Sequence, residues 1–264
     1  MSKENEIELP KVLKATDEKL QQNYVSLKTQ VTKNALHALQ VRIPEKMQKY
    51  EDLIPMSSNS SSILDNSDFP HDDPIYSVLT DTITEESAES EPKRFKTDDY
   101  QYIDGVVKLP KYIYSFKFDS SNKICDRISH IKQEATEMMD IVSNIKLWIQ
   151  LNIPKIEDGN NFGVAIQEDV IHELNRVEEA AFTLRDNTSK FYLQRAKLLT
   201  KILKYPKVED YRRALKELDE KQWFQMKVND LDTRNNYIII YDMLYKNWNK
   251  VVRPRTSDRS VMVY

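Results

Sequence analysis

The stretch "KIEDGNNFGVAIQ", residues 155–167, holds two of the three glycines of a 264-residue chain. Gly159 and Gly163 flank two asparagines and a phenylalanine, and an acidic pair precedes them. Glycine and asparagine both tolerate the left-handed backbone region. A helix C-cap followed by an ordinary turn is the simpler interpretation. The concentration of special residues favours a loop of one fixed shape, held by local hydrogen bonds.

Ten prolines divide the chain around this loop. Proline costs roughly 3 kcal/mol inside a helix, so helices are expected in the long proline-free windows. These windows are 11–43, 111–153, 155–205 and 207–253. Pro206 predicts a tight turn, and short connections make successive helices antiparallel neighbours. The predicted fold is all-α, a long antiparallel four-helix bundle in which residues 154–163 connect the second helix to the third.

Residues at three- and four-residue spacing predict which face of each helix is buried. The second helix is expected to bury Ile124, Ile128, Ile131, Ala135, Met138, Val142, Ile145 and Ile149. The third is expected to bury Val170, Leu174, Val177, Ala181, Leu184, Thr188, Phe191, Arg195, Leu198 and Ile202. The fourth row is Phe224, Val228, Leu231, Asn235, Ile238, Tyr241, Tyr245, Trp248 and Val252. The first and weakest row is Leu20, Tyr24, Leu27, Val31 and Ala38.

Residues 50–118 do not share this pattern. Between residues 56 and 99 there are eleven acidic and three basic residues, a net charge of −8 in a chain whose total is −3. Such a segment buries too little apolar surface to offset its ordering entropy. We predict a mostly disordered acidic loop at 50–118, between an N-terminal region with the first helix (1–49) and the remaining helices (119–264). The stretch "YIYSFKF", 112–118, fits either a short strand or a linker.

Sites for chemistry are hard to find in the sequence. The four histidines and the single cysteine show no metal-ligand spacing, and no glycine-rich phosphate loop or catalytic constellation is present. We therefore predict a protein that is not an enzyme and has no catalytic residues, cofactor or metal. Its net charge argues against nucleic-acid binding, and no apolar run approaches the roughly 18 residues of a membrane span.

The single cysteine also excludes an internal disulfide and fits an intracellular, reducing compartment. The short cluster "PKRFK", 92–96, is either a nuclear import signal or local charge balance within an acidic segment. A non-catalytic helical scaffold or adaptor is one function compatible with these observations.

Three longer stretches carry a resemblance to a known family. They are "WIQLNIPKIEDGNNFGVAIQEDV" (148–170), "RAKLLTKILKYPKVEDYRRALKELDEK" (195–221) and "YDMLYKNWNKVVRPR" (241–255). They resemble the 11S proteasome activators, the REG family, and "RAKL" and "KYPKVEDYRR" are most similar to its gamma type. The resemblance covers roughly 120–264, is weaker in the first helix and is absent from the acidic loop.

The resemblance implies a homo-heptameric ring of four-helix subunits that activates the 20S proteasome without ATP or ubiquitin. The C-terminal tails would anchor the ring between proteasome alpha subunits, and the loops between the second and third helices would open the gate. The gamma type further implies a nuclear location, and a cytoplasmic location stays open.

The resemblance also assigns roles to residues. The activation loop would comprise Lys155, Ile156, Glu157, Asp158, Gly159, Asn160, Asn161, Phe162 and Gly163. The flexible tail, 254–264, ends in the apolar group Val261, Met262, Val263 and Tyr264, which would be the proteasome anchor. Lys197 lies about 200° around the helix from Arg195. It is either an ordinary surface lysine or, as the gamma type implies, a channel-lining residue that favours cleavage after basic residues.

Overall fold

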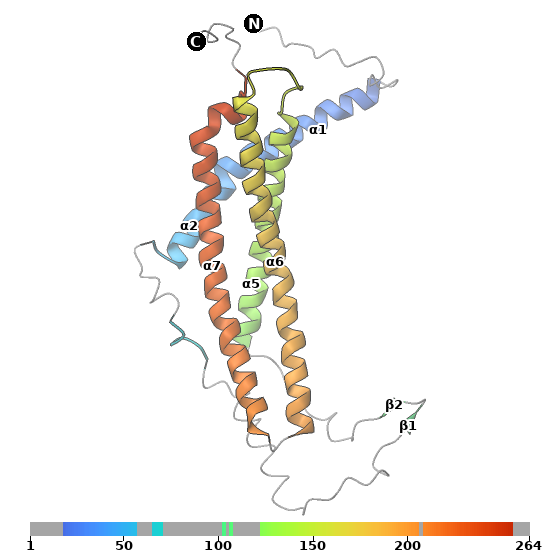
Figure 1. The fold of residues 1–264 in the computed structure, drawn as a ribbon, viewed down its shortest axis with the longest axis vertical. Helices are drawn as coiled ribbons and strands as arrows, with labels where there is room; N and C mark the ends of the chain where they lie inside the picture. The colour runs from blue at the N-terminus through green and yellow to red at the C-terminus, as the bar shows by residue number, and fades with distance from the viewer. Residues whose placement is uncertain are drawn as a thin grey trace, which may run out of the picture. The chain divides into compact units, whose positions relative to one another are not determined.

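The computed structural model describes residues 18–56, 65–70, 102–103, 106–107, 122–205 and 208–255. Its elements are α1 (Glu18–His37), the π-helix η1 (Ala38–Arg42), α2 (Ile43–Leu53), β1 (Tyr102–Ile103), β2 (Val106–Val107), α5 (Asn122–Leu151), α6 (Phe162–Lys204) and α7 (Glu209–Val252) (Figure 1). The two strands are two residues long and pair antiparallel, with Tyr102 opposite Val107. Helices dominate the described residues, so the predicted all-α class is confirmed.

The chain divides into two compact units, and each of the three long helices contributes to both. The first unit combines α1, η1 and α2 with α5 from Glu137, α6 up to Ala181 and α7 from Arg234. The second unit combines the segment at 65–70 with the beginning of α5, the remainder of α6 and α7 up to Thr233.

Successive helices of the first unit run antiparallel, as predicted. Along each pair of neighbouring helices, the contacting residue number rises in one helix as it falls in the other, so the two helices run in opposite directions. The contacts are Asn34–Asn144 and Lys46–Glu137 from the N-terminal helices to α5, Asn152–Gln167 and Lys146–Glu178 between α5 and α6, and Gln167–Val251 and Arg176–Asn236 between α6 and α7. The predicted turn at Pro206 is longer than expected, because α7 begins only at Glu209.

The predicted buried rows of α5 and α6 are confirmed. All eight members of the α5 row are at most 2% exposed. In the α6 row, eight of the ten members are buried, including the two polar ones, Thr188 and Arg195. Thr188 donates to the carbonyl of Arg185 at 2.7 Å, and Arg195 pairs with Asp219 of α7 at 3.1 Å. These partners satisfy polar groups that would otherwise be costly to bury.

The predicted row of α7 is wrong by one residue. The helix buries Leu215, Asp219, Trp223, Met226, Asp230, Thr233, Tyr237, Ile240, Leu244 and Val251. One residue corresponds to a rotation of about 100°, so the predicted row lies largely on the outside. Tyr245, for example, is 75% exposed. The apolar pattern was misleading because the buried row contains charged residues whose partners lie on other segments: Asp219 pairs with Arg195 and Asp230 with Arg127.

The first helical region is longer than predicted and only partly buried. It continues past Pro44 to Leu53, because the π-helix η1 bonds the Ile43 N–H to the carbonyl of Ala38 and places Pro44 in the first turn of α2. Of the predicted row, Ala38 is buried. Leu20, Tyr24 and Leu27 are more than half exposed. These side chains form an apolar face that the described part of this chain does not cover.

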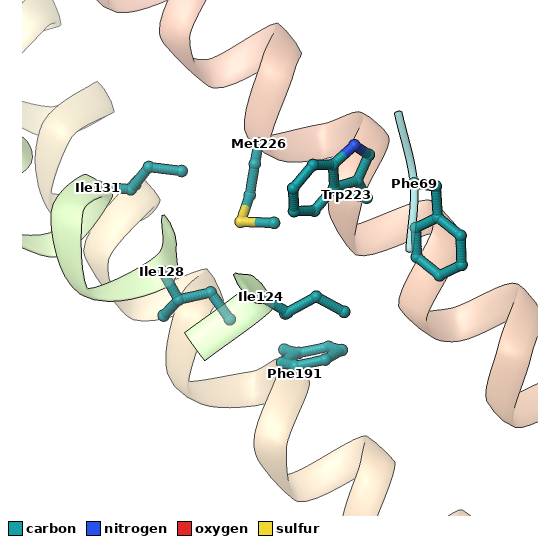
Figure 2. Packing of buried hydrophobic residues seen from close by; sticks show 7 residues of the cluster. All are labelled: Phe69, Ile124, Ile128, Ile131, Phe191, Trp223 and Met226. Atoms are coloured by element: carbon teal, nitrogen blue, oxygen red, sulfur yellow. The ribbon is translucent and has the colours of Figure 1, made fainter. Parts of the chain in front are cut away.

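Within the predicted acidic loop, the described residues 65–70 form a strap in the second unit. Phe69 is only 3% exposed and lies in a hydrophobic cluster built from α5, α6 and α7 (Figure 2). Its ring meets that of Trp223 edge-on at 6.3 Å. The other members of the cluster are Ile124, Ile128, Ile131, Phe191 and Met226. The stretches 92–96 and 112–118 lie outside the described residues.

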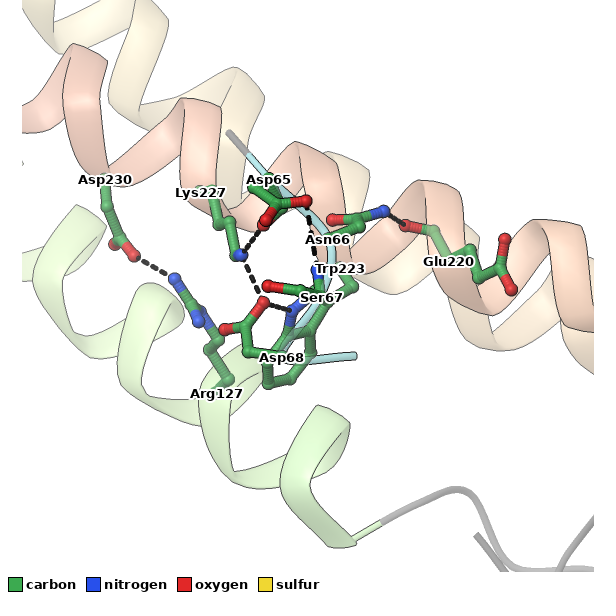
Figure 3. A network of polar contacts seen from close by, with 9 residues as sticks. All are labelled: Asp65, Asn66, Ser67, Asp68, Arg127, Glu220, Trp223, Lys227 and Asp230. Atoms are coloured by element: carbon green, nitrogen blue, oxygen red, sulfur yellow. Dashed lines mark hydrogen bonds and ion pairs between the residues drawn. The ribbon is translucent and has the colours of Figure 1, made fainter. Parts of the chain in front are cut away.

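Polar contacts hold the part of the strap that precedes Phe69 (Figure 3). Lys227 of α7 contacts the carbonyl of Asp65 and the carboxylate of Asp68, and Trp223 donates its indole N–H to Asp68 at 3.1 Å. Burial raises the pKa of Asp68, but the hydrogen bonds from Lys227 and Trp223 and the Lys227 charge outweigh it, so this pKa lies below the ordinary aspartate value. The strap is thus bound by one buried ring and a charged pair.

Replacing Phe69 with alanine is expected to destabilise the second unit by about 3 kcal/mol, because a buried aromatic ring leaves a cavity when truncated. The free energy of unfolding in urea measures the effect. Ser67→Ala, in the same strap but exposed, serves as the matched control and is expected to change stability by less than about 0.5 kcal/mol. Equal stability of the two variants would show that the strap adds nothing to the core.

Candidate functional site: the loop after α5 and the root of the C-terminal tail

The connection between α5 and α6 spans residues 152–161, two residues earlier at each end than the predicted 154–163, so Phe162 and Gly163 belong to α6. Gly159 and Asn160 adopt the left-handed region, with φ of 78° and 46°. This is the backbone predicted from the glycine and asparagine content. Asn161 then accepts the Ala165 N–H at 2.9 Å and donates its side-chain amide to the carbonyl of Glu157 at 3.3 Å. The loop therefore has one fixed local shape.

Gly163 has a different role from Gly159. It lies in the first turn of α6 and has no positive φ. A Cβ added there would lie 2.6 Å from the carbonyl carbon of Pro254 and 2.7 Å from its Cα, and closer still to its carbonyl oxygen. Gly163 is required because the chain leaving α7 passes against it.

The chain that follows α7 is fixed on the loop rather than frayed. Pro254 is buried, and the Arg255 side chain is 18% exposed. Arg255 Nη1 donates to the carbonyl of Lys155 at 2.8 Å and to Glu157 Oε2 at 3.1 Å, and Nη2 donates to Asn161 Oδ1 at 3.0 Å. The flexible tail predicted from residue 254 thus has a fixed root at 254–255, which is visible beside the loop in Figure 1.

Gln167 adds a second tie beneath the loop. Its side chain is fully buried and donates to the carbonyl of Val251 in the last turn of α7 at 2.8 Å. The sequence reasoning missed both Gln167 and Arg255. The only sign of Gln167 in the sequence is that it precedes Val170 by three residues and so continues the buried face of α6. No local pattern indicates Arg255.

The loop and the first residue of α6 present apolar side chains to solvent, while Lys155, Glu157 and Asn161 take part in polar contacts within the site. Ile156 is fully exposed and Phe162 is 71% exposed. Lys155 pairs with Glu157 at 3.1 Å, and this hydrogen bond, the Lys155 charge and the Arg255 charge outweigh desolvation and lower the pKa of Glu157. The ionised Glu157 carboxylate therefore stabilises the loop at pH values above the ordinary carboxyl pKa. This stabilisation is lost only as the pH falls through the lowered pKa of Glu157.

The other predicted site residues are not part of this cluster. Lys197 belongs to the second unit and is exposed, which agrees with the predicted direction away from buried Arg195. Val261, Met262, Val263 and Tyr264 lie outside the described residues. Within the described ranges, no group of three or more histidine, cysteine, aspartate or glutamate side chains is placed to hold a metal, and no helix is long and apolar enough to cross a membrane.

Comparison with known proteins places this loop and the helices around it in a known family. The family model "Proteasome activator PA28, C-terminal" matches residues 117–261. Proteasome activator complex subunit 3 of Homo sapiens is 43% identical over 143 residues, a match that spans 54% of this chain and 56% of the human protein. Proteasome activator 28 of Dictyostelium discoideum is 30% identical over 92% of this chain and 95% of its own.

The fold agrees with these sequence matches. The crystal structure of the 11S subunit PA28 of the Plasmodium falciparum proteasome superimposes with a TM-score of 0.77 at 41% identity, covering 95% of this chain and 100% of that one. An 11S activator solved in complex with a proteasome superimposes with a TM-score of 0.56 at 12% identity, which speaks for the fold alone. A family model that covers more than half of the chain and a relative aligned almost end to end show that the chain belongs to the PA28, or 11S, family of proteasome activators.

Proposed function

We propose that this chain is a subunit of a ring that activates the 20S proteasome without ATP or ubiquitin and is not itself an enzyme. In this proposal the C-terminal tail, ending in Val261–Tyr264, anchors the ring on the proteasome alpha subunits. The loop at 152–161 then contacts the alpha ring and opens the gate. Family membership supports the class of function, and the proposed location is nuclear, with a cytoplasmic pool left open.

The observation that carries this proposal is the fixed loop beside the root of the tail. A loop that reshapes a partner must be preorganised, since a loose one would lose binding free energy to its own ordering. The left-handed pair Gly159–Asn160 and the contacts of Arg255 supply that order. The exposed side chains of Ile156 and Phe162 supply an apolar contact surface. The adjacent tail would deliver this surface to the same partner.

We also propose that the ring is a homo-heptamer. Two exposed apolar groups support self-association: Leu20, Tyr24 and Leu27 on α1, and Tyr245 and Trp248 on α7. Apolar side chains gathered in this way commonly mark protein interfaces. Native mass measurement tests the proposal, because a heptamer has about seven times the 31.2 kDa mass of one chain.

The decisive test of the proposed function is peptide hydrolysis by purified 20S proteasome with and without the full-length protein, in the absence of ATP. Stimulation that saturates with added protein supports an activator. No stimulation, together with no co-sedimentation of the two, would overturn the proposal and favour a helical scaffold.

Replacing Lys197 with glutamate is expected to change which peptides are cleaved. Lys197 is exposed, and the resemblance to the gamma type implies that it lines the channel, where several copies would create a concentrated positive potential. The wild type should mainly stimulate cleavage after basic residues. The variant should shift the ratio of the three proteasome activities by roughly tenfold toward cleavage after apolar and acidic residues. Three fluorogenic peptides measure it. Lys190→Glu, another exposed lysine of α6, is the control, and identical profiles for Lys197→Glu and wild type would leave Lys197 as a surface lysine.

A further inference from the structure

Arg255 connects the end of α7 to the loop through a single guanidinium group. Its three acceptors, on Lys155, Glu157 and Asn161, lie 94 to 100 residues away in sequence and all belong to the loop. A guanidinium is planar and its donors point in fixed directions, so three such acceptors can be held only in one relative arrangement. The side chain is largely buried, and it therefore acts inside the site rather than on its surface.

The acceptors of Arg255 are the groups that shape the loop. Glu157 also pairs with Lys155, and its carbonyl accepts the side-chain amide of Asn161. The Asn161 carbonyl in turn accepts the Ala165 N–H of the first turn of α6. Arg255 thus contacts loop residues on both sides of the left-handed pair Gly159–Asn160.

The neighbours of Arg255 in the chain are fixed to the same elements. Val251 accepts the buried Gln167 amide, and Pro254 packs against Gly163 so closely that no side chain fits between them. The position of residues 254–255, which precede the tail, is consequently set by the loop and the first turn of α6.

We propose that Arg255 is a positioning residue that couples the C-terminal tail to the shape of the loop. This inference rests on the proposed function, in which the tail anchors and the loop opens the gate. Arg255 holds Ile156 and Phe162, the exposed apolar side chains of the loop region, at a fixed place relative to the anchored tail. Because such coupling is reciprocal, an anchored tail also restricts the loop to the conformation that contacts the partner.

The test compares three full-length variants in peptide hydrolysis by purified 20S proteasome. Arg255→Met keeps the aliphatic stem and removes the donors. It is expected to lower maximal stimulation by about tenfold, since several charge-assisted hydrogen bonds are lost, while the half-saturating concentration changes less than about threefold. Arg255→Lys, with a single point charge, is expected to restore part of the stimulation. Arg253→Met, two residues earlier and exposed, is the matched control and should behave as wild type.

A second measurement separates failure of this inference from failure of the proposed function. Amide hydrogen exchange of residues 155–161 in the free protein should be faster in Arg255→Met than in Arg253→Met. If the wild type stimulates hydrolysis and Arg255→Met matches it at saturation, the positioning role is overturned and the function stands. If the wild type does not stimulate at all, the proposed function fails. Equal hydrogen exchange in the two variants would then also overturn the role of Arg255 in holding the loop.

Discussion

Removing Val261–Tyr264 is expected to abolish binding to the 20S proteasome while the oligomer persists. These four residues are an apolar group that follows a polar spacer, a combination suited to insertion of an extended segment into a pocket of a partner. A ring multiplies a weak tail contact through effective concentration, so losing every tail should weaken binding by roughly 100-fold or more. Co-sedimentation with the 20S proteasome measures the loss, and native mass measures the oligomer.

A length-matched variant separates apolar chemistry from chain length. Replacing Val261–Tyr264 by four glycine and serine residues keeps the length of the tail and should lose binding equally. Retained binding in both variants would refute the tail as the anchor. A loss of the oligomer in either would indicate that the tail belongs to the subunit interface instead.

Gly159→Val and Asn160→Tyr are expected to abolish stimulation of peptide hydrolysis without preventing binding. Both positions have a left-handed backbone. Valine at Gly159 costs roughly 1–2 kcal/mol there because its β-branched side chain resists positive φ, and tyrosine at Asn160 lacks the tolerance of asparagine for this region. The loop would relieve this strain by changing shape, and its exposed side chains would then miss their target. Maximal stimulation should fall by about tenfold or more, with a half-saturating concentration within threefold of wild type.

Glu168→Val is the matched control for this experiment. It introduces the same β-branched side chain nine residues later, at an exposed position inside α6 where the backbone is helical. It should stimulate hydrolysis as the wild type does. Normal stimulation by Gly159→Val and Asn160→Tyr would mean that the connection between α5 and α6 is only a turn.

Gly163 has a structural role that differs from the one predicted from the sequence. The sequence grouped it with Gly159 as a source of backbone freedom, but its backbone is helical and its lack of a side chain makes room for Pro254. A substitution at Gly163 should therefore displace the tail root as well as the loop. No local pattern could separate these two roles, because Pro254 lies 91 residues further along the chain.

The sequence by itself determined the helices, the buried rows of α5 and α6, and the special backbone at Gly159–Asn160. Each depends on local properties: dense apolar residues at three- and four-residue spacing leave one face to bury, and only a few residue types accept positive φ. The prolines indicated where helices end, except at Pro44. There the π-helix η1 connects α1 to α2, and the helical region continues to Leu53.

Tertiary structure alone decided which face of α7 is buried, the position of the strap at 65–70 and the contacts of Arg255 with the loop. Asp219 and Asp230 could be buried only because Arg195 and Arg127 reach them from other helices. Phe69 belongs to an acidic, serine-rich segment, yet it is buried because apolar side chains of α5, α6 and α7 pack around it. Arg255 holds acceptors almost 100 residues away. In each case a polar or isolated side chain gains its role from a distant partner, and neither hydrophobic periodicity nor local composition carries information about that partner.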